Sequence, residues 1–198
     1  MTYAGHTFLD VHNVIVRGAP DFEPLDPSDV VDHIRAGDSP EVISMIADYL
    51  TAAREWVENE IQVSLCQRTV TLYLDCFPCW EVEWRFPPLQ SIASIVYLDY
   101  SGASQTLSAS LYRVDATGKP GRITPTYGEL WPCTYPVTKA ITITGTAGYA
   151  DAASVPASAK QAIRVLTKMM FDGGGVLCDD ALESVRRMLD PMRWEGYR

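Results

Sequence analysis

The segment from Ser39 to Ile61 constrains the fold more than any other, because it predicts one long helix. Ser39 is a suitable N-cap, with Pro40 at the first helical position and Glu41 in the first turn. Neither glycine nor proline interrupts the run after Pro40. Apolar residues at steps of three and four form one face: Ile43, Ile46, Leu50, Ala53, Val57 and Ile61. A helix of this length and pattern is expected to be the central packing element.

The same segment carries a second apolar strip beside the first. A helix that is apolar over so much of its circumference is expected to pack on more than one partner. It is either a central core helix, or a helix with one strip inside the subunit and the other facing a neighbouring subunit. The two interpretations are compatible. The second strip comprises Met45, Tyr49, Ala52 and Trp56, of which Met45, Tyr49 and Trp56 are the candidate subunit-interface residues.

The composition is that of an ordinary globular protein with one domain, or with one domain and an elaborate insert. The chain has 198 residues, of which 47% are hydrophobic and 21% are charged. It shows neither the charged start and apolar core of a signal peptide nor an apolar run of membrane-span length. We therefore expect a protein that is made in a cytoplasm and does not enter a membrane.

Negative charge is concentrated near the N-terminus. The net charge of the chain is −9, and residues 1–60 contain twelve acids but three bases. No basic patch with interleaved aromatic residues stands out, so tight binding to nucleic acid is not expected. An acidic surface beside DNA would instead repel it.

Between residues 67 and 150 the period of the apolar residues changes from helical to two. The runs 70–74 and 81–86 alternate apolar and polar residues, as in strands with one buried face. We expect these two runs to pair with each other through the turn at Cys76–Trp80. Further strands are predicted at 14–17, 92–98, 105–107, 111–115, 121–124 and 140–149.

Helical periodicity returns after Pro156 and is interrupted by Gly173–Gly175. Asp180 to Glu183 fits a capping box for a last helix. Near the N-terminus, a short helix is predicted to begin after the cap residue Asp26 and to end at Gly37.

The order of helices, then strands, then helices indicates an α+β fold. We expect a helical bundle base, formed by the long central helix plus the C-terminal helices, that carries an antiparallel β insert. The expected divisions are residues 1–24 for an N-terminal extension with a short strand, 25–66 for the N-terminal helices, 67–150 for the β insert, 151–190 for C-terminal helices that pack on the N-terminal ones, and 191–198 for a tail.

The motif Cys76-Phe77-Pro78-Cys79 is the first candidate for chemistry. A redox C-x-x-C needs its first sulfur at a helix N-terminus, where the thiol pKa is lowered. A zinc site needs a second pair of ligands at matching spacing. This motif lies between two predicted strands, and no other cysteine or histidine has such spacing. With an odd number of cysteines in the chain, five, we expect free and reduced thiols.

No other group of residues forms a recognisable catalytic or cofactor site. Gly173–Gly175 lacks the Lys-Ser or Lys-Thr of a phosphate loop and does not follow a strand. Asp179-Asp180 suits a helix cap better than a metal pair. His6, His12 and His33 have no nucleophile in a known signature. We therefore expect no cofactor, no metal and no enzymatic activity.

Two aromatic segments are candidates for binding other proteins, since Tyr, Trp and Arg are the residue types that anchor interfaces. One is the predicted loop 127–136, in which Tyr127, Trp131 and Tyr135 are expected to be exposed. The other is the tail, which either folds back on the helices of its own subunit or docks into a partner. The candidate residues of the tail are Met192, Arg193, Trp194, Tyr197 and Arg198.

Short segments in a fixed order carry a family resemblance from about Val14 to the tail. They are AREWVE at 53–58, PPLQSI at 87–92, LYRVD at 111–115, GRI at 121–123, and TAGY at 146–149 with VP at 155–156. In this order they resemble an AREYVE helix, a proline-rich segment before a strand, further strands, and a TAGY…VP joint into C-terminal helices. This is the pattern of the head–tail connector (adaptor) proteins of tailed phages and gene transfer agents.

The resemblance implies a structural protein of the virion neck. Members of the family form a ring, typically a dodecamer, below the portal protein of the DNA-filled head. The ring extends the channel, through which DNA passes without specific binding, and offers a platform to a downstream stopper or tail protein. By resemblance, the helices build the ring, the tail reaches the portal, and the β insert lies on the outer or tail-facing side. We add the hypothesis that some of the N-terminal acids line the channel and keep DNA from adhering.

Two other functions stay open. The first is a thiol oxidoreductase built on Cys76 and Cys79. The second is a monomeric binding module on the virion surface, against which the long two-sided helix argues.

Overall fold

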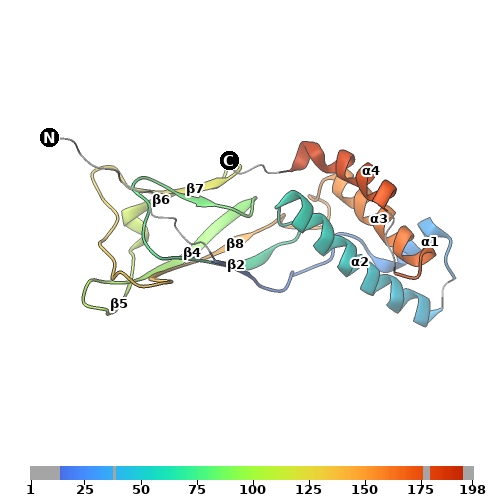
Figure 1. Ribbon diagram of the computed structural model, residues 1–198, viewed down its shortest axis with the longest axis horizontal. Helices are drawn as coiled ribbons and strands as arrows, with labels where there is room; N and C mark the ends of the chain where they lie inside the picture. Colours follow the sequence, from blue (N-terminus) through green and yellow to red (C-terminus); the bar gives the residue numbers. More distant parts are fainter. Residues whose placement is uncertain (1–13, 38, 176–178, 194–198) are drawn as a thin grey trace.

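The computed structural model describes residues 14–37, 39–175 and 179–193 of the chain. Within these residues the fold is mixed α+β, with four α-helices and two antiparallel sheets (Figure 1). The molecule is elongated, with the helices gathered at one end and the strands at the other (Figure 1). The predicted α+β class is therefore confirmed.

The long helix α2 spans Pro40–Ile61, as the apolar pattern predicts. The Ser39 hydroxyl accepts a hydrogen bond of 3.4 Å from the backbone N–H of Val42, which confirms the predicted N-cap. The helix ends where Gln62 adopts a left-handed conformation with φ of 57°. Its buried residues, Ile46, Leu50, Ala53, Val57 and Ile61 among them, lie on the predicted apolar face.

Helix α1 spans Pro27–Ile34 and is capped by Asp26, whose carboxylate accepts a hydrogen bond of 2.9 Å from the backbone N–H of Ser28. The prediction that Gly37 ends this helix is wrong. The helix stops earlier because Arg35 takes the left-handed conformation and its N–H turns back to the carbonyl oxygen of Asp32.

The C-terminal helices are α3 at Ala157–Asp172 and α4 at Asp179–Leu189, followed by the short 3₁₀ helix η2 at Asp190–Met192. The predicted break at Gly173–Gly175 is confirmed. The backbone N–H of Gly173 donates to the carbonyl oxygen of Met169, which closes the last turn of α3.

The larger sheet has the strand order β1-β2-β8-β4-β5, with antiparallel pairing throughout. Strand β1 precedes the helices in sequence, yet it pairs with β2, which follows them. The N-terminal strand thus belongs to the same sheet as the β insert. The strands are β1 (Val14–Arg17), β2 (Arg68–Leu74), β4 (Leu89–Leu98), β5 (Ser104–Thr106) and β8 (Ile141–Ala147).

The smaller sheet has the order β3-β7-β6 and lies over the larger one (Figure 1). The prediction that the runs 70–74 and 81–86 pair as a hairpin is wrong. Both edges of β2 are occupied by β1 and β8, so β3 crosses to the second sheet and pairs with β7. The strands are β3 (Val82–Trp84), β6 (Tyr112–Asp115) and β7 (Gly121–Pro125), with the 3₁₀ helix η1 (Ala109–Leu111) before β6.

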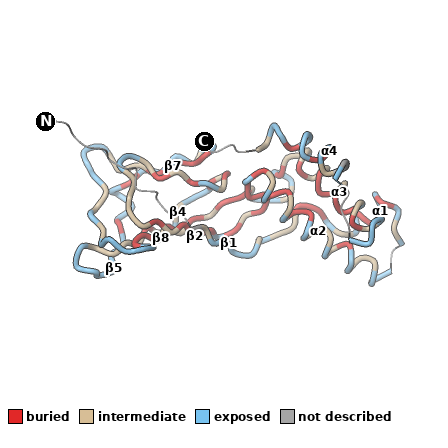
Figure 2. Tube along the Cα trace, viewed as in Figure 1, coloured by how far each residue is buried: buried red, intermediate tan, exposed pale blue. Residues whose placement is uncertain are grey.

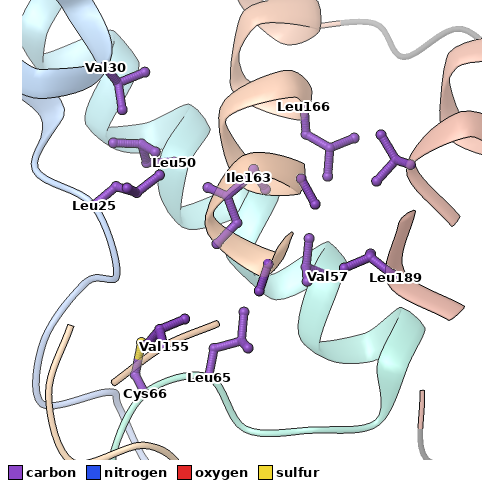
Figure 3. Close-up of a cluster of buried hydrophobic side chains, with 14 of the residues drawn as sticks. Leu25, Val30, Leu50, Val57, Leu65, Cys66, Val155, Ile163, Leu166 and Leu189 are labelled. Atoms are coloured by element: carbon purple, nitrogen blue, oxygen red, sulfur yellow. The ribbon is translucent and has the colours of Figure 1, made fainter. Parts of the chain in front are cut away.

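The molecule has two hydrophobic cores, one at each end. In the helical core, the side chains of Val30, Leu50, Ile163 and Leu166 come from α1, α2 and α3 and point toward one another (Figure 3). The sheet core lies between the two sheets and contains Trp84, Ile123 and residues of β2 and β8. Figure 2 shows the buried residues running along both ends of the molecule.

A buried ionic network joins the long helix to the larger sheet. The Glu58 carboxylate, in α2, is fully buried and accepts hydrogen bonds from Arg68 of β2 at 2.7 and 2.9 Å. It also accepts from Arg54 at 3.1 Å and from the backbone N–H of Leu65 at 2.8 Å. Arg54 in turn donates to Glu23 at 2.8 Å. The network therefore spans three parts of the chain that are far apart in sequence.

The sharp joint between the ends depends on Gly148, directly after β8. Its φ of +103° is disfavoured for any residue with a side chain. A Cβ at this position would lie 2.0 Å from the carbonyl oxygen of Cys66. Gly148 also donates its N–H to the carbonyl oxygen of Pro88 at 2.9 Å. Only glycine lets the backbones approach this closely.

We expect Glu58→Gln to lower the free energy of unfolding by about 3–5 kcal/mol, because the buried Arg68 would lose its carboxylate partner and the buried Arg54 would lose one of its carboxylates. Urea denaturation measures the change. The matched control is Glu55→Gln, whose side chain is 63% exposed and 3.8 Å from Arg54. The control is expected to change stability by less than about 0.5 kcal/mol. Equal effects of the two substitutions would contradict the structural role of the network.

We expect Gly148→Ala to destabilise the fold by about 3 kcal/mol or more, because both the backbone conformation and the contact with Cys66 forbid a Cβ. Thermal unfolding measures the loss. Gly37→Ala is the control, since a Cβ there meets no atom within 4 Å. If Gly148→Ala unfolds at a temperature close to that of Gly37→Ala, the backbone at Gly148 can shift to accept a Cβ, and the requirement for glycine would be contradicted.

Candidate interaction surfaces

The outer face of α2 is a continuous exposed stripe. We call it the α2 outer stripe, and its residues are Glu41, Ser44, Met45, Asp48, Ala52, Glu55 and Asn59. Figure 2 shows this exposed side of α2 directed away from α3. The stripe is broad enough to meet another protein and carries carboxylates rather than a purely apolar surface.

The structure separates the three candidate subunit-interface residues. Met45 lies in the α2 outer stripe and is 37% exposed. Tyr49 and Trp56 are half-buried at its border. Trp56 packs against the helical core, and the guanidinium of Arg186 in α4 lies 5.7 Å from the centroid of its ring. Much of Trp56 is therefore used within the subunit.

The loop after β7 presents aromatic side chains unevenly. Tyr127 is fully exposed and Tyr135 is 46% exposed, as predicted. Trp131 was expected to be exposed, and that expectation is wrong. Its ring stacks on Phe77 at 4.7 Å between centroids, and its indole N–H donates to the carbonyl oxygen of Trp80 at 3.3 Å. These two contacts hold the loop against the segment between β2 and β3.

A groove of about 350 Å³ lies beside this stack. The residues that line it carry no charged side chain and are Cys76, Phe77, Pro78, Cys79, Leu130, Trp131, Pro132, Cys133 and Thr134. Leu130 is 88% exposed and Trp80, next to the groove residue Cys79, is 84% exposed. Exposed apolar side chains of this size are typical of protein-binding surfaces.

The last described residues fold back on the helices. The sulfur of Met192 accepts a hydrogen bond of 2.9 Å from the Ser158 hydroxyl, and Met192 packs against the helical core. Arg193 forms an ion pair with Glu60 at the end of α2. Trp194, Tyr197 and Arg198, the other tail candidates, lie outside the described residues. The start of the tail is thus anchored on its own subunit.

The C-x-x-C segment does not have the geometry of a redox motif. Cys76 and Cys79 follow the end of β2 and precede β3, so neither residue begins a helix that the structure describes. Burial, followed by the charge of Asp75, raises the pKa of the Cys76 thiol. A raised pKa leaves less of the reactive thiolate. The described thiols Cys66, Cys76, Cys79 and Cys133 are free.

The other residues that the sequence offered as metal, phosphate or catalytic candidates do not form a site in the described part of the chain. Among the described residues, no three His, Cys, Asp or Glu side chains are grouped closely enough to hold a metal ion. Gly173–Gly175 follows the C-terminus of α3, where backbone carbonyls rather than N–H groups are unpaired. His33 is exposed in the last turn of α1, whereas His6 and His12 lie outside the described residues. Among the helices that the structure describes, none combines the length and the apolar composition needed to cross a bilayer.

The ionic network was missed by sequence reasoning, although a signal was present. Arg54 and Glu58 stand four residues apart beside Ala53 and Val57, so they fall on the inner side of α2. Charged residues on an apolar helix face indicate a buried pair. The partner, Arg68, has no such signal because it lies in a different element.

We expect the double variant Cys76→Ser, Cys79→Ser to match the wild-type chain in stability and in assembly into particles, because the pair lacks the helix N-terminal position of a redox motif. The wild-type chain should reduce a model disulfide no faster than the variant. In the native protein, a thiol reagent should label the exposed Cys79 and Cys133 but not Cys66, which is fully buried and whose pKa burial raises to about 12. A wild-type reduction rate clearly above that of the variant would revive the oxidoreductase interpretation.

Comparisons with known proteins identify the fold. Neither a protein-family model nor a curated protein matches the chain. Three solved structures contain chains of the same fold, and each alignment covers 93% of this chain. In the neck of an empty gene transfer agent particle computed with C6 symmetry, the TM-score is 0.78 with 19% identity, over 97% of that chain.

The other two structures agree with the first. In the neck of the native particle computed with C12 symmetry, the TM-score is 0.71 with 18% identity, over 97% of that chain. In the virion of the native particle, the TM-score is 0.70 with 18% identity, over 96% of that chain. The chain therefore has the fold of a chain found in the neck of gene transfer agent particles, and the resemblance to neck connectors is confirmed at the level of the fold.

Proposed function

We propose that this chain is a head–tail connector of a tailed phage-like particle. It forms a ring under the portal, extends the DNA channel and docks the next neck or tail protein. The observation that carries the proposal is the fold match over 93% of the chain with a neck chain at a TM-score of 0.78. The protein acts as a structural part of the virion neck, without catalysis or cofactor, after synthesis in the host cytoplasm.

The two hydrophobic cores support the assignment of different roles to the helical end and the strand-rich end of the subunit. Residues 25–66 and 151–190 form a helical base around the long central helix and build the ring. Residues 67–150 form the β insert, which faces outward or toward the tail. Residues 1–24 are an extension with one strand, and residues 191–198 are the tail. The separate hydrophobic clusters of the helical and strand-rich ends favour this assignment.

Neighbouring subunits meet through the second apolar strip of α2, with Met45, Tyr49 and Trp56. Met45 is the exposed member and is available to another subunit. A dodecameric ring suits this proposal, since the related necks were computed with C12 and C6 symmetry.

Two segments are proposed to bind other neck proteins. The tail residues Met192, Arg193, Trp194, Tyr197 and Arg198 form the portal-binding segment, in which Met192 and Arg193 hold the start of the tail on the helices of its own subunit. The loop residues Tyr127, Trp131 and Tyr135 face the downstream stopper or tail protein. The full exposure of Tyr127 and the uncharged groove that Trp131 lines support the second assignment.

DNA passes through the ring without specific binding. Exposed carboxylates of the N-terminal third, such as Asp29 and Asp32 on α1, are candidates to line the channel. Their charge would repel the phosphate backbone and keep DNA mobile.

Two other functions are less well supported. A thiol oxidoreductase would need an activated sulfur, whereas burial raises the pKa of Cys76. A monomeric binding module on the virion surface would not need a 22-residue helix with a long exposed stripe.

Cryo-electron microscopy of the particle neck tests the proposed function. Density for this chain as a ring between portal and tail supports it, and the same map identifies the carboxylates that face the channel. The absence of the chain from the neck would overturn it.

We expect Tyr127→Ala to reduce tail attachment while changing the free energy of unfolding by less than about 0.5 kcal/mol, because the side chain has no contacts to lose. Trp131→Ala should lower the stability by about 1–3 kcal/mol, because it removes the stack on Phe77. Negative-stain microscopy counts tailed particles, and urea denaturation measures stability. Normal tail attachment with Tyr127→Ala would contradict the assigned role of the loop.

A further inference from the structure

The α2 outer stripe carries three carboxylates and no basic residue. Glu41, Asp48 and Glu55 are exposed on the same face as Met45. Among the described residues, Glu41 and Asp48 have no ion-pair partner, and Glu55 lies 3.8 Å from Arg54. The outer side of this helix is therefore strongly negative over most of its length.

Helix α3 carries the opposite charge. Lys160, Arg164 and Lys168 follow at steps of four residues, which places them along one side of the helix. We call these three residues the α3 basic stripe. Lys168 pairs with Asp172 at 2.8 Å, in a pair whose two side chains are more than half exposed. Within the described part of the chain, Lys160 and Arg164 form no ion pair.

The subunit's own carboxylates near the α3 basic stripe leave its first two cations unpaired. Lys160 and Arg164 line a cavity of about 550 Å³ that Glu23, Asp26 and Asp29 also line. Glu23 is paired with Arg54, and Asp26 accepts hydrogen bonds from Ser28 as the cap of α1. Asp29 is exposed and forms no ion pair with either cation. Asp151 is also exposed and attracts Lys160 from beyond ion-pair distance. Among the described residues neither Lys160 nor Arg164 has a close carboxylate partner, so both can pair with a carboxylate of another copy.

A subunit contact through Met45 would also remove the neighbouring carboxylates from water. Burying a charge without a partner is costly, so such a contact needs cations from the next subunit. The helical rise of about 1.5 Å per residue separates Asp48 from Glu55 by about 10 Å and Lys160 from Lys168 by about 12 Å. The part of the α2 outer stripe from Asp48 to Glu55 is therefore about as long as the α3 basic stripe and opposite to it in charge.

The placement of the stripes suits a ring. Helices α2 and α3 pack on each other through buried residues such as Leu50 and Ile163 (Figure 3). The α2 outer stripe is exposed, whereas the α3 basic stripe is exposed at Lys168 and half-buried at Lys160 and Arg164. The two stripes lie on different helices and are therefore two different surfaces. A contact between two different surfaces repeats head to tail and closes into a ring, whereas a surface that pairs with itself gives a dimer.

We propose that the α2 outer stripe of one copy docks on the α3 basic stripe of the next copy. The carboxylates of Asp48 and Glu55 pair with the three cations of the α3 basic stripe. The exposed Met45, on the same face of α2, is covered by the same contact. The proposal rests on the proposed ring function and specifies which face of the neighbour each subunit meets.

Charge reversal with cross-complementation tests the pairing. One variant carries Asp48→Lys and Glu55→Lys, and the other carries Lys160→Glu and Arg164→Glu. Each variant alone would bring like charges together at every contact. An equimolar mixture would restore opposite charges in a ring that alternates the two variants. A control with Glu83→Lys and Glu129→Lys makes the same change in net charge as the first variant, but at the strand-rich end.

The readout is the number of copies per neck in purified particles, from cryo-electron microscopy and quantitative immunoblotting. Thermal unfolding checks that each variant folds. We expect either variant alone to lose neck occupancy by about tenfold or more, and the mixture and the control to recover most of the wild-type occupancy. If a reversal disturbs folding, Glu55→Gln and Lys160→Gln should produce a weaker loss in the same direction.

The outcomes separate this proposal from the ring function. Normal occupancy with either reversal, or failure of the mixture to assemble while both variants are folded, overturns the pairing and leaves the ring function standing. Absence of the wild-type chain from the neck overturns both.

Discussion

The buried carboxylate of Glu58 is the contact on which the arrangement of the two ends depends. It receives hydrogen bonds from Arg54 in the same helix, Arg68 at the start of β2, and the backbone of Leu65 between them. Each charge has a partner, so their removal from water is compensated. Because α2 and β2 are tied through one group, the long helix holds a defined position relative to the larger sheet. The close approach of Gly148 to Cys66 completes this joint from the side of β8.

The joint lets the two ends of an elongated subunit serve different contacts. The helical end has its own core and carries an exposed acidic stripe on α2 and a partly exposed basic stripe on α3. The strand-rich end has a second core, exposes Tyr127 and contains an uncharged groove. The connector function that we propose requires this combination, since neighbours in a ring and partners above and below would meet separate surfaces. A rigid joint keeps these surfaces at constant spacing.

Local signals predicted the helices well. The caps Asp26 and Ser39 and the apolar face from Ile46 to Ile61 are contained within consecutive residues, and the structure confirms them. Strand positions were also predicted to within a few residues, with β4 beginning at Leu89 rather than Ile92. The pairing of the strands was not predicted correctly, because a strand such as β2 or β3 has the same alternation of apolar and polar residues whichever strand it pairs with. The prediction that Trp131 is exposed was wrong for a similar reason, since its stacking partner Phe77 belongs to a distant segment.

The sequence by itself determined the α+β class, the extent of the long helix and the absence of a recognisable catalytic motif, because these follow from residues close together along the chain. The tertiary structure alone decided that β3 joins the second sheet, that Arg68 completes the ionic network, and which charges stay in water. Hydrogen-bonded pairing and burial depend on segments that meet only after folding. The apolar neighbours of Glu58 along α2 indicate that it is buried, whereas its ion pair with Arg68 joins two elements and exists only in the folded chain.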